Sequence, residues 1–67
     1  SEADNIDNTR LAIIFAYILD ENHDLAMDFY NIEINNFISI EKKNEAIKLL
    51  NSTVEGVRLT EYFRLFK

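Results

Sequence analysis

The chain almost lacks the two residues that most often form turns. Among its 67 residues there is one glycine, Gly56, and no proline. Tight turns usually contain these residues because glycine adopts positive φ and proline fixes φ. A β-rich domain of this length needs several such turns, whereas helix interiors need neither residue. The scarcity of both therefore predicts an all-α fold.

Cysteine is also absent, so no disulfide can stabilise the chain. Apolar residues make up 48% of it, which is typical of a globular protein. A domain of this length buries only about 60% of the surface that its unfolded chain exposes. Small folds without disulfides or metals are often stabilised by association. We therefore expect one helical domain over residues 1–67, alone or cut from a longer protein, completed by self-association. A homo-oligomer or another protein is the expected partner.

Neither a membrane span nor a secretory leader is expected. The longest apolar run covers residues 11–19, nine residues, whereas a spanning helix needs about 20. A basic flank followed by an apolar stretch and a small-residue cleavage site is missing. Together with the lack of cysteine, this predicts an intracellular, cytoplasmic protein.

The first helix is expected over residues 8–19. Asp7 can cap it, and Ile6 and Leu11 stand at the two positions of a hydrophobic staple. The run from Leu11 to Leu19 is apolar on all sides, which predicts a helix buried around most of its circumference. A buried strand is the competing interpretation, because Ile and Phe favour strands.

A polar connection, residues 20–24, is followed by a second predicted helix over residues 25–37. Asn22 or Asp24 is suited to cap it. Residues 32–40 also alternate between apolar and polar side chains, with an Asn-Asn pair at the centre. That pattern fits a β-hairpin, so helix and hairpin both remain open for this segment.

A third helix is expected over residues 40–50, with Ser39 as its cap. Residues 52–55 match a capping box and predict a fourth helix over residues 53–66. A single helix through both segments would be roughly 40 Å long at 1.5 Å per residue, too long for a compact monomer of this size. A break between residues 51 and 56 is therefore expected, and the predicted fold is a small bundle of three or four helices.

Charge is distributed unevenly along the chain. Residues 1–40 hold eight acidic side chains and one basic one, whereas residues 41–67 hold four acidic and six basic ones. The two parts therefore carry net charges of −7 and +2. Solvated helix surfaces account for such a pattern. An acidic half and a basic half can also pack against each other, within one chain or between chains.

One segment partly matches a calcium-binding loop, with Asp20, Asn22 and Asp24 at the first ligand positions. Leu25 stands where the sharp turn requires glycine, and Asn31 stands where a bidentate Glu is required. His23 is the single histidine, so one chain cannot supply a zinc site. We expect no metal and no cofactor.

No catalytic arrangement can be identified. The three serines lie at the chain start or at expected helix caps, without a histidine and carboxylate placed to activate them. A domain this small can hardly enclose a substrate pocket of about 300 Å³ or more. We therefore expect neither an enzyme nor a small-molecule substrate.

The C-terminal segment is rich in aromatic residues, although chain ends are usually polar and frayed. Aromatic side chains together with arginine are enriched in protein interfaces. Packing within the chain's own core is the alternative explanation. The predicted partner interface consists of Leu59, Tyr62, Phe63, Arg64 and Phe66.

These observations predict a protein–protein interaction or dimerisation module with a regulatory or adaptor role. The alternative is a small nucleic-acid-binding regulator whose basic helix, around Lys42, Lys43 and Lys48, follows the second helix as in a helix-turn-helix. The net charge of −5 disfavours this alternative, because neutralising phosphates supplies most of the nonspecific affinity for nucleic acid.

Overall fold

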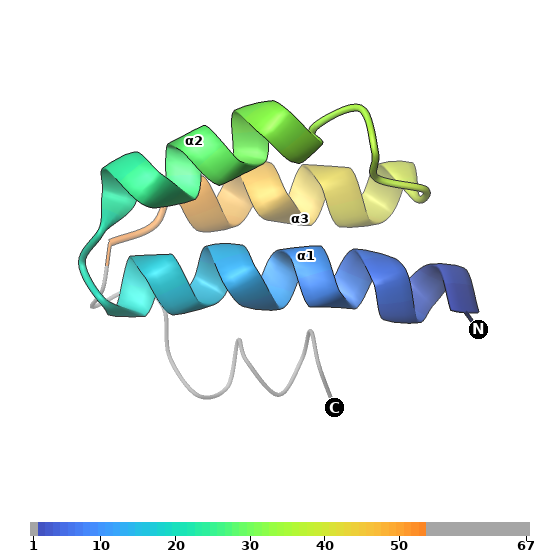
Figure 1. The fold of residues 1–67 in the computed structure, drawn as a ribbon, viewed down its shortest axis with the longest axis horizontal. Helices are drawn as coiled ribbons and strands as arrows, with labels where there is room; N and C mark the ends of the chain where they lie inside the picture. Colours follow the sequence, from blue (N-terminus) through green and yellow to red (C-terminus); the bar gives the residue numbers. More distant parts are fainter. Residues whose placement is uncertain (1, 54–67) are drawn as a thin grey trace.

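A computed structural model of the chain describes residues 2–53, apart from the side chains of Ala3 and Asp4. This part is a small helical bundle without strands. Figure 1 shows α1 along one side of the bundle, with α2 and α3 both packed against it. The helices are α1 (Glu2–Leu19), α2 (His23–Glu33) and α3 (Ile40–Leu50). The expected all-α class is confirmed for the described residues.

The core lies on the inner face of α1, where α2 and α3 meet it. Along α1 the buried residues recur at intervals of three and four, as they do on one face of an amphipathic helix. The fully buried alanines of α2 and α3 leave room for these helices to lie close to α1. The core residues are Leu11, Ile14, Phe15 and Ile18 of α1, Ala26 and Tyr30 of α2, and Ala46, Leu49 and Leu50 of α3.

Helix α1 begins earlier than the sequence predicts, at Glu2 rather than Asn8. Asp7 therefore lies inside the helix and does not cap it, because its carboxylate is bound to the chain before α3. Ile6 is also helical and 40% exposed, so the expected staple is not formed. The apolar run is a helix and not a strand, but it is buried on one face only, since Ile13 and Leu19 are exposed.

Helix α2 is shorter than expected and ends at Glu33. Asn22 occupies the N-cap position without a side-chain capping bond, and Asp24 lies in the first turn. The hairpin interpretation of residues 32–40 is wrong, because Ile32 is helical and a non-helical connection runs from residue 34 to residue 39. A turn closes there, with the backbone N–H of Asn36 donating to the Glu33 carbonyl at 2.8 Å.

Helix α3 has the predicted bounds, and the Ser39 hydroxyl accepts a hydrogen bond from the backbone N–H of Lys42 as the expected cap. The helix ends at Leu50, and Asn51 is its C-cap. A continuous helix from residue 40 to residue 66 is therefore excluded, and the predicted break is confirmed. The predicted fourth helix lies outside the described residues.

None of the described helices is both long and apolar enough to span a lipid bilayer.

Candidate interaction surface

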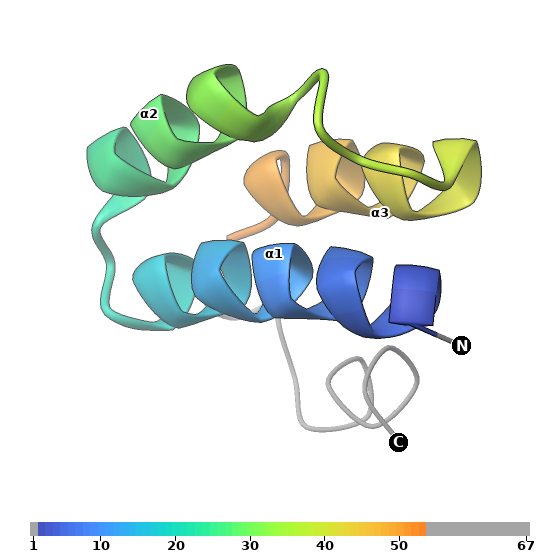
Figure 2. The same cartoon turned by 45° about the vertical axis from the view of Figure 1, so that its right-hand side comes forward.

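An open groove of about 320 Å³ runs between α1 and α2. The connection between the two helices is short, and α2 runs back along α1 in both Figure 1 and Figure 2. Ile6 and Ile13 are seven residues apart on α1 and therefore lie on one face of it. We call this feature the α1–α2 groove; its lining residues are Ile6, Thr9, Arg10 and Ile13 of α1 and Phe29 and Glu33 of α2.

The apolar surface continues along α2 beyond the groove. Leu25, Phe29 and Ile32 are spaced by four and three residues, so they lie on one face of the helix. Leu25 is 44% exposed and Ile32 is 73% exposed. Solvent-exposed isoleucines and leucines that occur singly are common, but here they adjoin a groove that is itself lined with isoleucine and phenylalanine.

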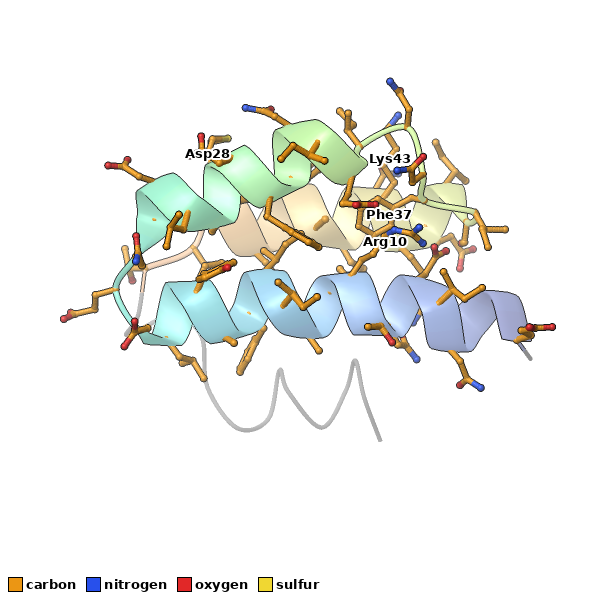
Figure 3. The ribbon with its side chains drawn as sticks, in the orientation of Figure 1. Arg10, Asp28, Phe37 and Lys43 are labelled. Atoms are coloured by element: carbon orange, nitrogen blue, oxygen red, sulfur yellow. The ribbon has the colours of Figure 1, made fainter. Side chains whose placement is uncertain are left out.

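A polar cluster lies within this groove, because Arg10 stands between Ile6 and Ile13 along α1. The Nε of Arg10 donates to Oε2 of Glu33 at 3.0 Å, and the Nδ2 of Asn36 donates to the same oxygen at 3.0 Å. The guanidinium carbon of Arg10 lies 5.9 Å from the ring centre of Phe37, within the range of a cation–π contact. Figure 3 shows Arg10 beside Phe37. Arg10 thus ties α1 to the end of α2 and to the following loop.

The carboxylate of Asp7 is fully buried on the other side of Arg10. Its Oδ1 accepts from the backbone N–H of Ile38 at 2.9 Å, and its Oδ2 accepts from that of Ser39 at 2.7 Å. Its Oδ1 also lies 3.5 Å from a terminal nitrogen of Arg10. A buried carboxylate is normally costly, and here two backbone donors and one cation compensate it. Asp7 therefore binds α1 to the start of α3.

The electrostatics of this cluster favour the ionised form of Glu33. The side-chain amide of Asn36 and the guanidinium of Arg10 both hydrogen-bond to its carboxylate, and they hold the pKa of Glu33 below its usual value of 4.5. Hydrogen bonds to the charged form of a carboxyl group have this effect in general. Glu33 thus remains a fixed negative charge at the edge of the groove at neutral pH.

The only histidine links α2 to α3. The ring Nε2 of His23, the first residue of α2, lies 2.8 Å from the carbonyl oxygen of Leu50, the last residue of α3. A carbonyl oxygen only accepts, so Nε2 carries the proton in this contact. His23 is exposed, and at the start of α2 its ring links this helix to the end of α3.

Exposed acidic side chains lie at the start of α1, in the turn that follows it and on α2. In the described part of the chain, none of them forms an ion pair. Asp28 lies on the side of α2 that faces away from α1 in Figure 3. We call this set the acidic rim; its exposed members are Glu2, Asp20, Glu21, Asp24 and Asp28.

No metal-binding group is present within residues 2–53, since no three acidic or histidine side chains there are placed to hold an ion. This includes the segment that partly matches a calcium loop. His23 of that segment contacts Leu50 instead.

The structure places the residues of the nucleic-acid alternative on α3. Lys48 is 72% exposed and lies 3.7 Å from Glu45, whereas Lys42 and Lys43 are half-buried. The loop between α2 and α3 runs from residue 34 to residue 39, longer than the three- or four-residue turn typical of a helix-turn-helix. This geometry does not bring the three lysines together on one exposed face.

The predicted C-terminal interface, Leu59, Tyr62, Phe63, Arg64 and Phe66, lies outside the described residues. The α1–α2 groove was not predicted, although its signal is present in the sequence as the seven-residue spacing of Ile6 and Ile13. The sequence predicts that α1 is buried on all sides, and this prediction left no exposed apolar face on which a groove could form. Comparison of the chain with protein-family models, with curated proteins and with solved structures finds no match.

Proposed function

We propose that the protein is an interaction module without catalytic activity, with a regulatory or adaptor role, and that the α1–α2 groove is its binding surface. The observation that carries this proposal is the groove, in which Ile6, Ile13 and Phe29 form an apolar floor open to solvent. Leu25 and Ile32 are exposed on the same face of α2 as Phe29 and extend this apolar surface. Surfaces of this kind, bordered by charged residues, are typical of protein-binding sites.

The shape of the groove supports a macromolecular partner. Small-molecule sites enclose most of their ligand and have a few convergent polar groups. This groove is open, and its polar side chains Arg10 and Glu33 already bind each other. An apolar face of a protein partner could cover it without displacing that pair.

Nucleic acid is the less supported partner. The apolar surface belongs to α1 and α2, which carry a single basic residue, Arg10. Phosphate binding requires several lysines or arginines on one surface. A mobility shift with DNA or RNA at low salt, lost on replacing Lys42, Lys43 and Lys48, would support that alternative instead.

Site-specific photo-cross-linking in the source cells tests the proposal. Ile13 is replaced by benzoylphenylalanine, and Ile47 of α3, with a similar exposure of 40% against 36%, serves as the matched control. We expect position 13, but not position 47, to cross-link to one defined segment of a partner protein or of a second copy. Absence of cross-links at both positions, or the same products at both, would contradict the proposal.

A further inference from the structure

We infer that the occupant of the α1–α2 groove is a basic amphipathic helix of a partner protein. This inference rests on the proposed function and specifies the chemistry of the partner. It combines the shape of the apolar surface with the charge of the rim.

The shape favours a helix. Two antiparallel helices present parallel rows of apolar side chains, Ile6 and Ile13 on one and Leu25, Phe29 and Ile32 on the other. A third helix can lay side chains spaced by three, four and seven residues between such rows. Pairing with an extended segment requires a free strand edge, and residues 2–53 contain no strand.

The charge favours a basic partner. The acidic rim is exposed, and Arg10 is already engaged by Asp7 and Glu33. Lysines and arginines flanking the apolar face of a docked helix would meet this rim with opposite charge, which speeds association and selects the partner. A helix with acidic flanks would be repelled by it.

The same rim disfavours two other occupants. A second copy docked through its own α1–α2 groove would place two acidic rims against each other. An anionic membrane surface would also be repelled, because such surfaces attract basic segments. The partner is therefore expected to be another protein with basic flanks.

Binding of two synthetic helices to the full chain tests this inference. Each peptide has about 18 residues, long enough to form a helix, with a leucine face; one has lysines on its flanks and the other has glutamates. We expect the lysine peptide to bind at least about tenfold more tightly by calorimetry, and to lose affinity as salt screens the rim. Amide NMR shifts should be largest along α1 and α2.

Matched surface variants locate the site. Ile32→Ser should weaken binding of the lysine peptide several-fold, whereas Ile40→Ser on α3, with 69% exposure against 73%, should not. Asp28→Asn should weaken binding about two- to threefold, whereas Glu41→Gln on α3 should have little effect. All four side chains are exposed, so circular dichroism should show an unchanged fold.

Several results would overturn the inference. The inference is wrong if both peptides bind equally well, if neither binds, or if the α3 variants have the larger effects. It is also wrong if the chain binds vesicles of anionic lipid. A cross-link from position 13 to a second copy would also overturn it. A cross-link from position 13 to a partner segment without basic residues would overturn the inference and leave the proposed function standing, whereas absence of any specific cross-link would contradict the proposed function itself.

Discussion

Asp7 joins two helices that are distant in sequence, because its buried carboxylate binds the backbone N–H groups of Ile38 and Ser39. These donors precede α3 and have no partner within it, as is general for helix N-termini. The negative charge also lies favourably at the positive end of the α3 dipole. One side chain of α1 thus satisfies two donors of the loop and orients the start of α3.

Replacing this carboxylate should destabilise the fold strongly. We expect Asp7→Asn to lower the free energy of unfolding by about 3 kcal/mol, because it removes a charge-assisted acceptor and leaves Arg10 partly unpaired. Asp28→Asn, at an exposed position, should change it by less than about 0.5 kcal/mol. Urea unfolding followed by circular dichroism measures both. Equal stability of the two variants would show that Asp7 contributes little.

Glu33 should make stability depend on pH. Its folded-state pKa lies below 4.5, so its ionised form stabilises the fold above that pH, and this contribution disappears as pH falls through 4.5 and then through the lower folded-state pKa. The stability difference between the native chain and Glu33→Gln should therefore shrink in acid. Urea unfolding over a pH series measures it, and a difference independent of pH would contradict the prediction.

Asn36→Ala provides the matching control for Glu33. It removes the amide that contributes most to lowering the pKa of Glu33 and leaves the Arg10 contact in place. The pH dependence should become weaker but should not vanish.

At this scale the sequence predicts local roles and misses long-range ones. Ser39 was predicted as a cap because its partner, Lys42, is three residues away. Asp7 is predicted to cap the first helix, but its carboxylate binds the chain before α3, where its partners are 31 and 32 residues away. The spacing of residues along the chain contains no information about such a contact.

Among the helices, α3 is the one that the sequence predicts to the residue, since a serine cap and a C-terminal polar stretch bound it. The end of α2 was not predictable in the same way. Asn36 forms a local turn with Glu33 and binds its carboxylate, whereas the more distant Arg10 binds the same carboxylate and Asp7 holds the loop that follows. Local and tertiary contacts together therefore decide where α2 ends.

The two caps of α3 should differ in strength. The Ser39 hydroxyl accepts at 3.4 Å, a long hydrogen bond, whereas the Asp7 oxygens accept at 2.9 and 2.7 Å. We expect Ser39→Ala to cost about 0.5–1 kcal/mol, clearly less than Asp7→Asn. Thermal unfolding of the two variants compares them, and a larger loss for Ser39→Ala would reverse this ranking.

For the whole molecule, the sequence predicts the all-α class from composition and the number of helices in residues 2–53 from their caps and apolar segments. The groove could not be predicted in this way. Whether an apolar residue on α1 faces the core or solvent depends on where α2 and α3 dock, and Ile13 and Ile14 are adjacent in sequence but differ from 36% to 0% exposure.

Self-association is a prediction at the scale of the molecule. The small core and the lack of disulfides predict a dimer or larger oligomer at micromolar concentrations. If the C-terminal aromatic residues form that interface, Phe63→Ala should remain helical and become monomeric. If Phe63 belongs to the core, the variant should lose about 3–5 kcal/mol of stability. Sedimentation and circular dichroism separate the two cases, and a native chain that is monomeric at every concentration would contradict self-association.

The contact between Asp7 and the loop before α3 has a further consequence for hydrogen–deuterium exchange. The amides of Ile38 and Ser39 lie at the start of a helix, where exchange is usually fast because helix ends fray. Both are bound to a carboxylate of another helix, so they exchange only when α1 separates from the loop. The exchange rate of the Ser39 amide therefore measures how often α1 undocks, and Asp7→Asn should accelerate it while the middle of α3 retains its protection.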